Sequence, residues 1–313
     1  MGGIGIVNNP RARRNQRDPE IARHLRNVLD SDGELVDAST PDELERAVER
    51  FRAARIDVLG VNGGDGTGHC VLSAFARAYG RDPLPRLLLL RGGAMNTVAR
   101  AHAIRGSPER ILRRVLARLR VSLPLRTVER DLLRVEADAG PARFGFIFGT
   151  GVVVRFLDAY YRSRRPSPAT AAALLFRAAA SAVANGRFAA SLVQRERLRI
   201  ATDGDEWPDA SYLTLVAASV PEIGLGFRVF ARCDEQPGFF HAVGVHGAPL
   251  QVVRALPRLR RGRPWRRRIA QDEVARELVL EGDAPRFTVD GELYAAARVV
   301  RVTTGPGIEL VLP

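Results

Sequence analysis

The stretch VLGVNGGDGT at residues 58–67 decides the fold of this chain. An apolar run from Ile56 to Asn62 predicts a buried strand, and the glycine-rich turn after it leads into a predicted helix from about His69 to Tyr79. This order is typical of an open parallel sheet, where ligands bind beyond the carboxyl ends of the strands. Glycines let backbone N–H groups approach phosphate oxygens, and the helix N-terminus adds partial positive charge. The stretch therefore predicts a phosphate-binding turn.

The same alternation of strands and helices fills the first part of the chain. Strands are predicted at 3–9, 34–38 and 86–90, and helices at 19–30, after Thr40 and from Asn96. Thr40, followed by a proline and then by Glu43, has the pattern of a capping box. Strands that alternate with helices imply a parallel sheet with right-handed crossovers. We therefore predict an N-terminal α/β domain over residues 1–123.

After Pro124 short strand signals dominate, so the second half has a different predicted architecture. They are interrupted by an alanine-rich helical insertion at 168–185, and an arginine-rich segment follows at 254–268. The chain is thus predicted to be α/β plus β, with an antiparallel β-sandwich domain over 124–303. The predicted strands lie at 132–137, 144–154, 198–202, 212–219 and 227–231.

The composition excludes several classes of enzyme. The net charge is +13, and all 48 basic residues are arginines. A chain without lysine has no P-loop lysine, no protein-kinase β3 lysine and no Schiff-base lysine. Its two cysteines, Cys70 and Cys233, lie too far apart for a zinc ribbon and favour a reducing compartment. No HExxH or GxSxG motif occurs, and the five histidines show no ligand spacing.

Three local motifs carry the chemistry, and each has a structural alternative. Within Gly63-Gly64-Asp65-Gly66-Thr67, a carboxylate beside phosphate points to Mg²⁺ or to acid–base work, although a tight Asx-type turn would explain it too. The segment RGGAMNT at 91–97 is a second strand–glycine–helix turn in which Gly93 and Asn96 can meet a nucleotide, or Asn96 can cap a helix. Asp290-Gly291-Glu292 is an acidic pair or a hairpin turn.

A dinucleotide fingerprint fits poorly, because His69 stands where its third glycine is needed. Together the motifs resemble those of the diacylglycerol kinase and sphingosine kinase catalytic-domain superfamily, in its bacterial lipid-kinase branch. Asn8-Asn9-Pro10, GGDGT at 63–67, GGAMNTVAR at 92–100 and DGE at 290–292 occur in that family's order and approximate spacing. The resemblance implies that residues 1–123 form a nucleotide-binding α/β domain, which the C-terminal strand 304–313 can join. It also implies that the larger β-sandwich at 124–303 takes the lipid substrate and that ATP is the phosphoryl donor.

By this resemblance, each motif receives a role. Asn9 contacts the nucleoside part of ATP, and Gly63, Gly64, Gly66 and Thr67 hold the phosphates together with Gly93 and Asn96. Asp65 serves catalysis and binds Mg²⁺. Asp290 is the general base on the lipid hydroxyl, and Glu292 assists the metal or the nucleotide. Thr40 matches a nucleotide contact only loosely, because its capping role competes.

The chain also departs from the family pattern. In the second loop, Arg91, Ala94 and Thr97 replace the usual Pro, Thr and Asp, and the lost Thr hydroxyl removes a hydrogen bond of about 1 kcal/mol. The segment PGFF at 237–240 replaces an Asp-Gly-x-Leu turn that binds a structural metal in some relatives, so that site is expected to be absent.

The predicted function is an ATP- and Mg²⁺-dependent lipid kinase that acts on diacylglycerol or a related lipid. The alternatives are an NAD kinase-like enzyme and an inactive module that binds nucleotide or lipid. No run of about 18 uninterrupted apolar residues occurs, so we expect a cytoplasmic protein, peripheral to the inner face of the membrane.

The arginine-rich segment is the predicted contact with an anionic membrane. Eight arginines and no acidic residue lie between Arg254 and Arg268, with Leu256, Leu259 and Trp265 among them. Anionic headgroups attract such segments, while a solvated loop is the alternative. With 6% aromatic residues, nucleic acid is not an expected partner, and a homodimer stays open.

Overall fold

The computed structural model describes residues 3–138, 140–163, 166–184, 186–208 and 211–313. The chain divides into two compact units, Met1–Arg130 with Pro306–Pro313, and Asp131–Gly305. The alanine-rich insertion was predicted to extend to Asn185, and that residue lies outside the described part. Among the described residues, no helix is long and apolar enough to cross a membrane.

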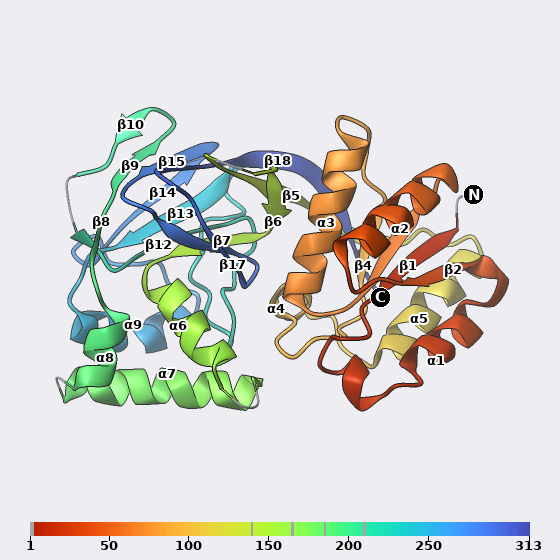
Figure 1. Ribbon diagram of the computed structural model, residues 1–313, viewed down its shortest axis with the longest axis horizontal. Helices are drawn as coiled ribbons and strands as arrows, with labels where there is room; N and C mark the ends of the chain where they lie inside the picture. The colour runs from red at the N-terminus through yellow and green to blue at the C-terminus, as the bar shows by residue number, and fades with distance from the viewer. Residues whose placement is uncertain (1–2, 139, 164–165, 185, 209–210) are drawn as a thin grey trace. The chain divides into compact units, whose positions relative to one another are not determined.

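The first unit is built on a parallel sheet (Figure 1). Its strands are β1 (Ile4–Asn8), β2 (Gly33–Asp37), β3 (Val58–Asn62) and β4 (Arg86–Leu89), in the order β4-β3-β1-β2. The far end of β18 (Val299–Leu312) adds beside β4, with Leu310 opposite Leu87. β1 and β3 are buried at every position, as expected for central strands covered on both faces.

Helices follow the strands of this unit and cover the sheet. They are α1 (Ile21–Leu29), α2 (Pro41–Ala53), α3 (Asp65–Tyr79), α4 (Thr97–Ala101) and α5 (Pro108–Arg120), with short 3₁₀ turns at Asn15–Arg17 and Asp30–Asp32. α1 packs against α5, and α2 packs against α3. The two pairs lie on opposite sides of the strands in Figure 1. The Thr40 capping box is confirmed: the Thr40 hydroxyl accepts from the Glu43 N–H, and the Glu43 carboxylate accepts from the Thr40 N–H.

The second unit contains a six-stranded antiparallel sheet in the order β14-β13-β12-β7-β16-β17. A second group of antiparallel strands faces it, formed by β10-β9-β15 and the first half of β18, while β5 pairs with β6. The bounds are β5 (Arg126–Ala137), β6 (Arg143–Gly145), β7 (Ile147–Thr150), β8 (Glu196–Arg197), β9 (Arg199–Thr202), β10 (Asp205–Glu206), β11 (Ser211–Tyr212), β12 (Thr214–Ala218), β13 (Phe240–Val245), β14 (Ala270–Ala275), β15 (Glu277–Glu281), β16 (Arg286–Val289) and β17 (Glu292–Ala295).

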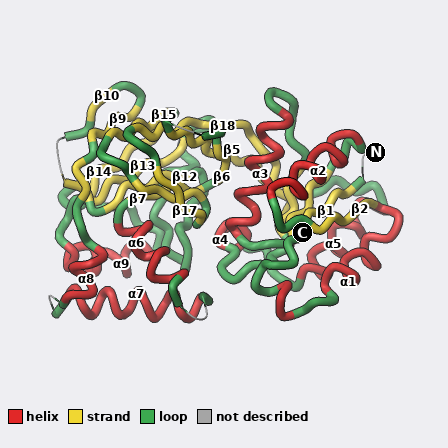
Figure 2. Tube along the Cα trace, in the orientation of Figure 1, coloured by secondary structure: helices red, strands yellow, loops and turns green. Residues whose placement is uncertain are grey.

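One hydrophobic core joins the two groups of strands. Leu278 and Val300 from one group pack with Leu215, Phe148 and Phe287 from the other. The helices α6 (Val152–Tyr161), α7 (Pro168–Val183), α8 (Arg187–Leu192) and α9 (Pro249–Arg260) gather on one side of the strands (Figure 2). The predicted class, a parallel-sheet α/β domain followed by an antiparallel β-sandwich, is confirmed.

Three predicted elements differ from the structure. The strand predicted at 144–154 ends at Thr150, because Gly151 turns the chain at a φ of 59° and α6 begins at Val152. No strand forms at 227–231: Phe227 closes a turn, with its N–H bonded to the Gly224 carbonyl. Helix α3 begins at Asp65, so GGDGT occupies the N-cap and first turn of the helix that was predicted from His69.

Candidate active site

Polar side chains occupy the carboxyl edge of the parallel sheet, where three apolar strands end. Asn8 is in register with Asp37 and with Asn62, so the last residues of β1, β2 and β3 are neighbours. The Asn8 amide donates to Asp37 Oδ1 at 2.5 Å, and the Asn62 amide donates to Asn8 Oδ1 at 2.7 Å. Asn8 and Asn62 are almost fully buried, so this network fixes the strand ends from which the glycine loops start.

The loop after β1 is tied to this edge and to α3. Asn15 is buried, and its amide donates to the carbonyls of Asn9 at 2.8 Å and Asn62 at 3.0 Å. Asn9 donates from its own amide to Thr67 Oγ1 at 2.9 Å. Asn9 and Thr67, two predicted site residues from different loops, therefore meet. Asn15 and Asn62 are not among the predicted site residues, although an apolar strand that ends in asparagine is a signal for such an edge.

The two glycine loops touch each other through their backbones. A Cβ on Gly93 would lie 2.1 Å from the Cα of Gly64, so no side chain fits at that position. A Cβ on Gly63 would lie 2.4 Å from the Thr67 side chain, which folds back over it. Hydrogen cannot be replaced here by any larger group without moving the loops. The two strand–glycine–helix turns therefore face each other at close range.

Asp65 links the first loop to the helix after the second. Its Oδ1 accepts from the Val98 N–H at 3.4 Å, at the start of α4. Burial raises the pKa of the Asp65 carboxyl, and the hydrogen bonds from Thr97 and Val98 offset this only in part. Because burial raises this pKa more than the hydrogen bonds lower it, a bound cation would stabilise the ionised carboxylate.

Asn96 uses both ends of its amide within its own loop. Its Oδ1 accepts from the Gly93 N–H at 3.1 Å, and its Nδ2 donates to the Gly93 carbonyl at 2.9 Å. The residue has a left-handed conformation with φ 49° and occupies the N-cap position of α4 without a side-chain cap bond. Asn96 therefore shapes the loop at Gly93, which is the contact its side chain makes in this structure.

Arginines surround the second loop without acidic partners. The Arg14 N–H donates to the Gly92 carbonyl at 3.0 Å, which places Arg14 beside Arg91. Burial lowers the pKa of Arg91, and so do the positive charges of Arg14 and Arg100. Nε of Arg91 is buried with no hydrogen-bond partner, and among the described residues none of the three arginines forms an ion pair with a carboxylate. Such a group of uncompensated cations fits an anionic ligand.

Thr40 is the one predicted nucleotide contact in this unit whose hydrogen bonds do not connect it to the other predicted site residues. It is exposed at the start of α2, and its side chain takes part in the capping box.

The second unit holds Asp290 in a rigid position. Asp290 is buried at the turn after β16, with φ 47°. Its Oδ1 accepts from the Ile147 N–H at 2.9 Å, and its Oδ2 accepts from the Phe146 N–H at 3.0 Å. A Cβ on Gly145 would lie 2.5 Å from Oδ2, so a glycine at 145 makes room for the carboxylate.

Helix α6 supports the turn that carries Asp290 and Glu292. Tyr161 donates its hydroxyl to the Gly291 carbonyl at 2.9 Å, and Asp158 accepts two bonds from Arg286, at 2.7 and 3.0 Å. Glu292 itself is exposed at the start of β17. No helix was predicted here: the strand predicted at 144–154 overlaps the start of α6, and the supporting residues Asp158 and Tyr161 lie beyond it.

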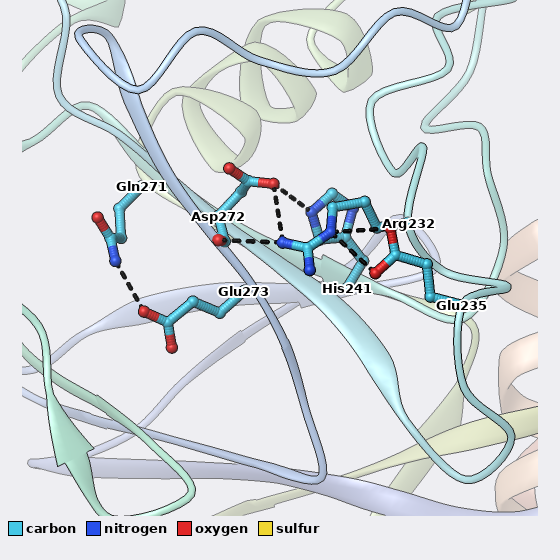
Figure 3. Close-up of polar contacts among 6 residues, drawn as sticks. All are labelled: Arg232, Glu235, His241, Gln271, Asp272 and Glu273. Carbon is cyan, nitrogen blue, oxygen red and sulfur yellow. Dashed lines mark hydrogen bonds and ion pairs between the residues drawn. The ribbon is translucent and has the colours of Figure 1, made fainter.

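A separate polar cluster in the second unit holds a long connection to the sheet (Figure 3). Arg232 bonds to Glu235 at 3.0 Å and to Asp272 Oδ2 at 3.4 Å, and His241 Nε2 lies 3.2 Å from the same Asp272 oxygen. The hydrogen bond with His241, and then Arg232, lower the pKa of Asp272. This cluster fastens the segment between β12 and β13 onto β14.

Solved structures share this fold over the whole chain. A diacylglycerol kinase from Bacillus anthracis strain Sterne aligns with a TM-score of 0.65 at 12% identity, covering 100% of this chain and 97% of that one. A further B. anthracis structure, provisionally assigned to the same activity, aligns with 0.71 at 14% identity and the same coverage. Yeast NADH kinase, complexed with NADH, aligns with 0.51 at 10% identity over 99% of this chain and 83% of its own.

No curated protein matches the sequence. The family model of the diacylglycerol kinase catalytic domain matches residues 4–127, the stretch that contains both glycine loops and the arginines around them. This match supports a kinase that uses a nucleotide. It also confirms the resemblance that the motifs indicate: residues 4–127 of this chain are similar to the diacylglycerol kinase catalytic domain.

Proposed function

We propose that the protein is an ATP- and Mg²⁺-dependent lipid kinase that phosphorylates a hydroxyl of diacylglycerol or a related lipid. The observation that carries the proposal is the pair of glycine loops in backbone contact at the carboxyl edge of the sheet, inside the residues that match the catalytic-domain family. Phosphoryl transfer needs positioning and charge neutralisation more than covalent chemistry. Both requirements suit backbone loops and arginines.

The residues of the first unit fit a nucleotide triphosphate. The Gly64–Gly93 contact leaves backbone rather than side chains facing the ligand, and the unpaired Arg91, with Arg14 and Arg100, supplies positive charge that the lysine-free chain must provide by arginine. Asp65 would hold Mg²⁺, which when bound supplies neutralisation of phosphate charge. Glu292, the other predicted ligand, stays a prediction.

Asp290 is proposed as the general base. As the lipid hydroxyl oxygen bonds to the γ-phosphorus, its proton passes to the Asp290 carboxylate and ADP leaves. The N–H donors of Phe146 and Ile147 hold the carboxylate in one orientation. A base that is fixed before the substrate arrives has lost its conformational freedom already, which supports a role in positioning.

Helix α7 offers the second unit an apolar face toward a lipid surface. Only Ala171 of this 16-residue helix is buried, and the side chains of Phe176 and Val183 are 76% and 63% exposed. The exposed residues fall at helical spacing and, apart from Arg177, are apolar: Ala169, Ala172, Ala173, Phe176, Ala180 and Val183. Basic flanks complete the pattern, since residues 159–195 contain six arginines and no acidic residue. A helix of this kind lies on an anionic membrane rather than across it.

The arginine-rich segment 254–268 is proposed to add charge to that surface, in a revised form. Its first part belongs to α9, which packs against α7. Leu259 is buried, and Trp265 packs with it against Ala255 and Ile269, so these apolar side chains hold the segment to the protein. The arginines at 266–268 are exposed and remain available to headgroups.

The deciding experiment is transfer of label from [γ-³²P]ATP into a mixed lipid extract, with identification of the product. A parallel reaction contains NAD⁺ in place of lipid, and the Asp290→Asn variant serves as the control for both. Label in a lipid supports the proposal. Label in NAD⁺ alone would establish the NAD kinase-like alternative, and nucleotide binding without any transfer would establish an inactive module.

A further inference from the structure

Two carboxylates and an imidazole converge in the first unit, on the side of the sheet that α1 and α5 cover. One ligand atom from each of Asp18, His24 and Glu109 lies within 4.8 Å of the other two. Asp18 ends the 3₁₀ turn before α1, His24 lies in the first turns of α1, and Glu109 lies in the first turn of α5. The side chains of Asp18 and Glu109 are half-buried.

In the part of the chain that the structure describes, no hydrogen bond or ion pair joins the three groups to one another. Among the described residues, His24 forms no ion pair with either carboxylate, and neither Asp18 nor Glu109 pairs with an arginine. This is unusual in a chain with 48 arginines and 35 acidic residues, where Glu20 on the same helix is paired with Arg23. Groups too far apart for a hydrogen bond but close enough to share one neighbour are arranged as metal ligands are.

The backbone holds the three ligands in place without any metal. The Asp18 carbonyl accepts from the Ile21 N–H at 3.1 Å, and Ser107 caps α5 by accepting from the Arg110 N–H at 3.4 Å. Buried Leu25 of α1 and Leu112 of α5 lie beneath the packed helices. His24 and Glu109 also line an open depression of about 770 Å³, which leaves room for water as a further ligand.

We propose that Asp18, His24 and Glu109 bind a first-row divalent cation of the Zn²⁺ type, at a site distinct from the glycine loops. An imidazole with two carboxylates is a donor set that suits Zn²⁺ and disfavours Mg²⁺, which prefers oxygen ligands and keeps its waters. The bound ion would join α1 to α5. Arg120, which lines the same depression, is neutralised by Asp32 at 2.7 Å.

The test is calorimetric titration of the EDTA-dialysed full-length protein with ZnCl₂ in the presence of millimolar Mg²⁺. We expect one Zn²⁺ per chain and a rise in Tm on binding. His24→Ala and, separately, Glu109→Gln should each weaken this binding by more than about tenfold and abolish the rise. Asp30→Asn is the matched control, because Asp30 lines the same depression without belonging to the cluster, and it should bind as the wild type does.

Absence of Zn²⁺ binding by the wild type would overturn the proposal. Binding that is unchanged in both His24→Ala and Glu109→Gln would also overturn it, since the ion would then sit elsewhere, for example at the exposed thiol of Cys70. Circular dichroism of each variant shows whether it is folded, and two independent variants guard against the loss of one.

Discussion

Gly145 offers a way to move the proposed base without changing its chemistry. In a Gly145→Ala variant, the new Cβ would lie 2.5 Å from Asp290 Oδ2 and 2.7 Å from a methyl group of Val289. Contacts of a real Cβ begin at 3.0–3.4 Å, so the carboxylate must move by about 0.5–0.9 Å. The residue at 290 is still an aspartate in this variant, but its carboxylate is displaced from its position in the wild type. The variant therefore separates positioning from chemical identity.

The size of the effect follows from that displacement. A misplacement of about 1 Å at a reacting group can cost about 100-fold in rate, while complete loss of a general base costs about 10²–10⁴-fold. We expect kcat to fall about 10- to 100-fold in Gly145→Ala. The bonds from Phe146 and Ile147 to the carboxylate weaken at the same time, each worth about 1.5–3 kcal/mol. The free energy of unfolding should therefore drop by about 1–3 kcal/mol.

The assay is initial-rate lipid phosphorylation at saturating ATP, together with urea unfolding of the same preparation. Gly149→Ala on the adjacent β7 is the control, because its Cβ would come no closer than 3.3 Å to Val153 and 3.4 Å to a Thr288 methyl, and so would not displace Asp290. It should keep wild-type kcat. A Gly145→Ala variant that loses stability as predicted yet retains wild-type kcat would refute the assignment of Asp290 as a positioned base.

Further changes test other parts of the proposal. Asp65→Asn should lower turnover at least about 100-fold. Because burial raises the pKa of Asp65, the folded state favours its protonated form and the wild type loses stability as pH rises above about 4. Urea unfolding of Asp65→Asn at pH 7 should therefore give a midpoint no lower than that of the wild type. Asp272→Asn should cost about 2 kcal/mol at pH 7 in urea unfolding. That cost should shrink as pH falls below 3.8 and through the lowered pKa of Asp272. Glutamine at 266–268 should reduce co-sedimentation with anionic vesicles about 100-fold, at about 1 kcal/mol per arginine. Phe176→Ser should reduce binding to anionic and zwitterionic vesicles alike, by more than about tenfold.

Features that depend on neighbouring residues in the chain were predictable. The Thr40 capping box involves residues three apart, and the strand that ends at Asn62 is indicated by an apolar run followed by glycines. Each feature is stabilised by neighbours in the sequence, so the local sequence is enough to predict it. The start of α3 was placed late because glycines lower helix propensity, whereas here Gly64 serves as the N-cap.

Features that depend on tertiary contacts were not predictable. Val152 and its valine neighbours have high strand propensity, but a Cβ at Gly151 would lie 2.2 Å from the Leu213 carbonyl oxygen, so the chain must turn there and a helix follows. Phe227 looked like part of a strand and instead packs against the cluster that contains Leu259. In both places tertiary packing overrides the preference of the local sequence.

The same reasoning changes how the unusual second loop is interpreted. A proline at position 91, as the family pattern has it, fixes φ near −65°, whereas Arg91 has φ 60°. The replacement therefore alters the path of the backbone as well as its charge, and the altered path still brings Gly93 against Gly64. A loop that binds no ligand gains nothing from a half-buried guanidinium whose Nε has no hydrogen-bond partner and which lies beside two further arginines. An uncompensated positive charge lowers the stability of the protein unless an anionic ligand binds beside it. The replacement at Arg91 therefore supports anion binding rather than loss of function.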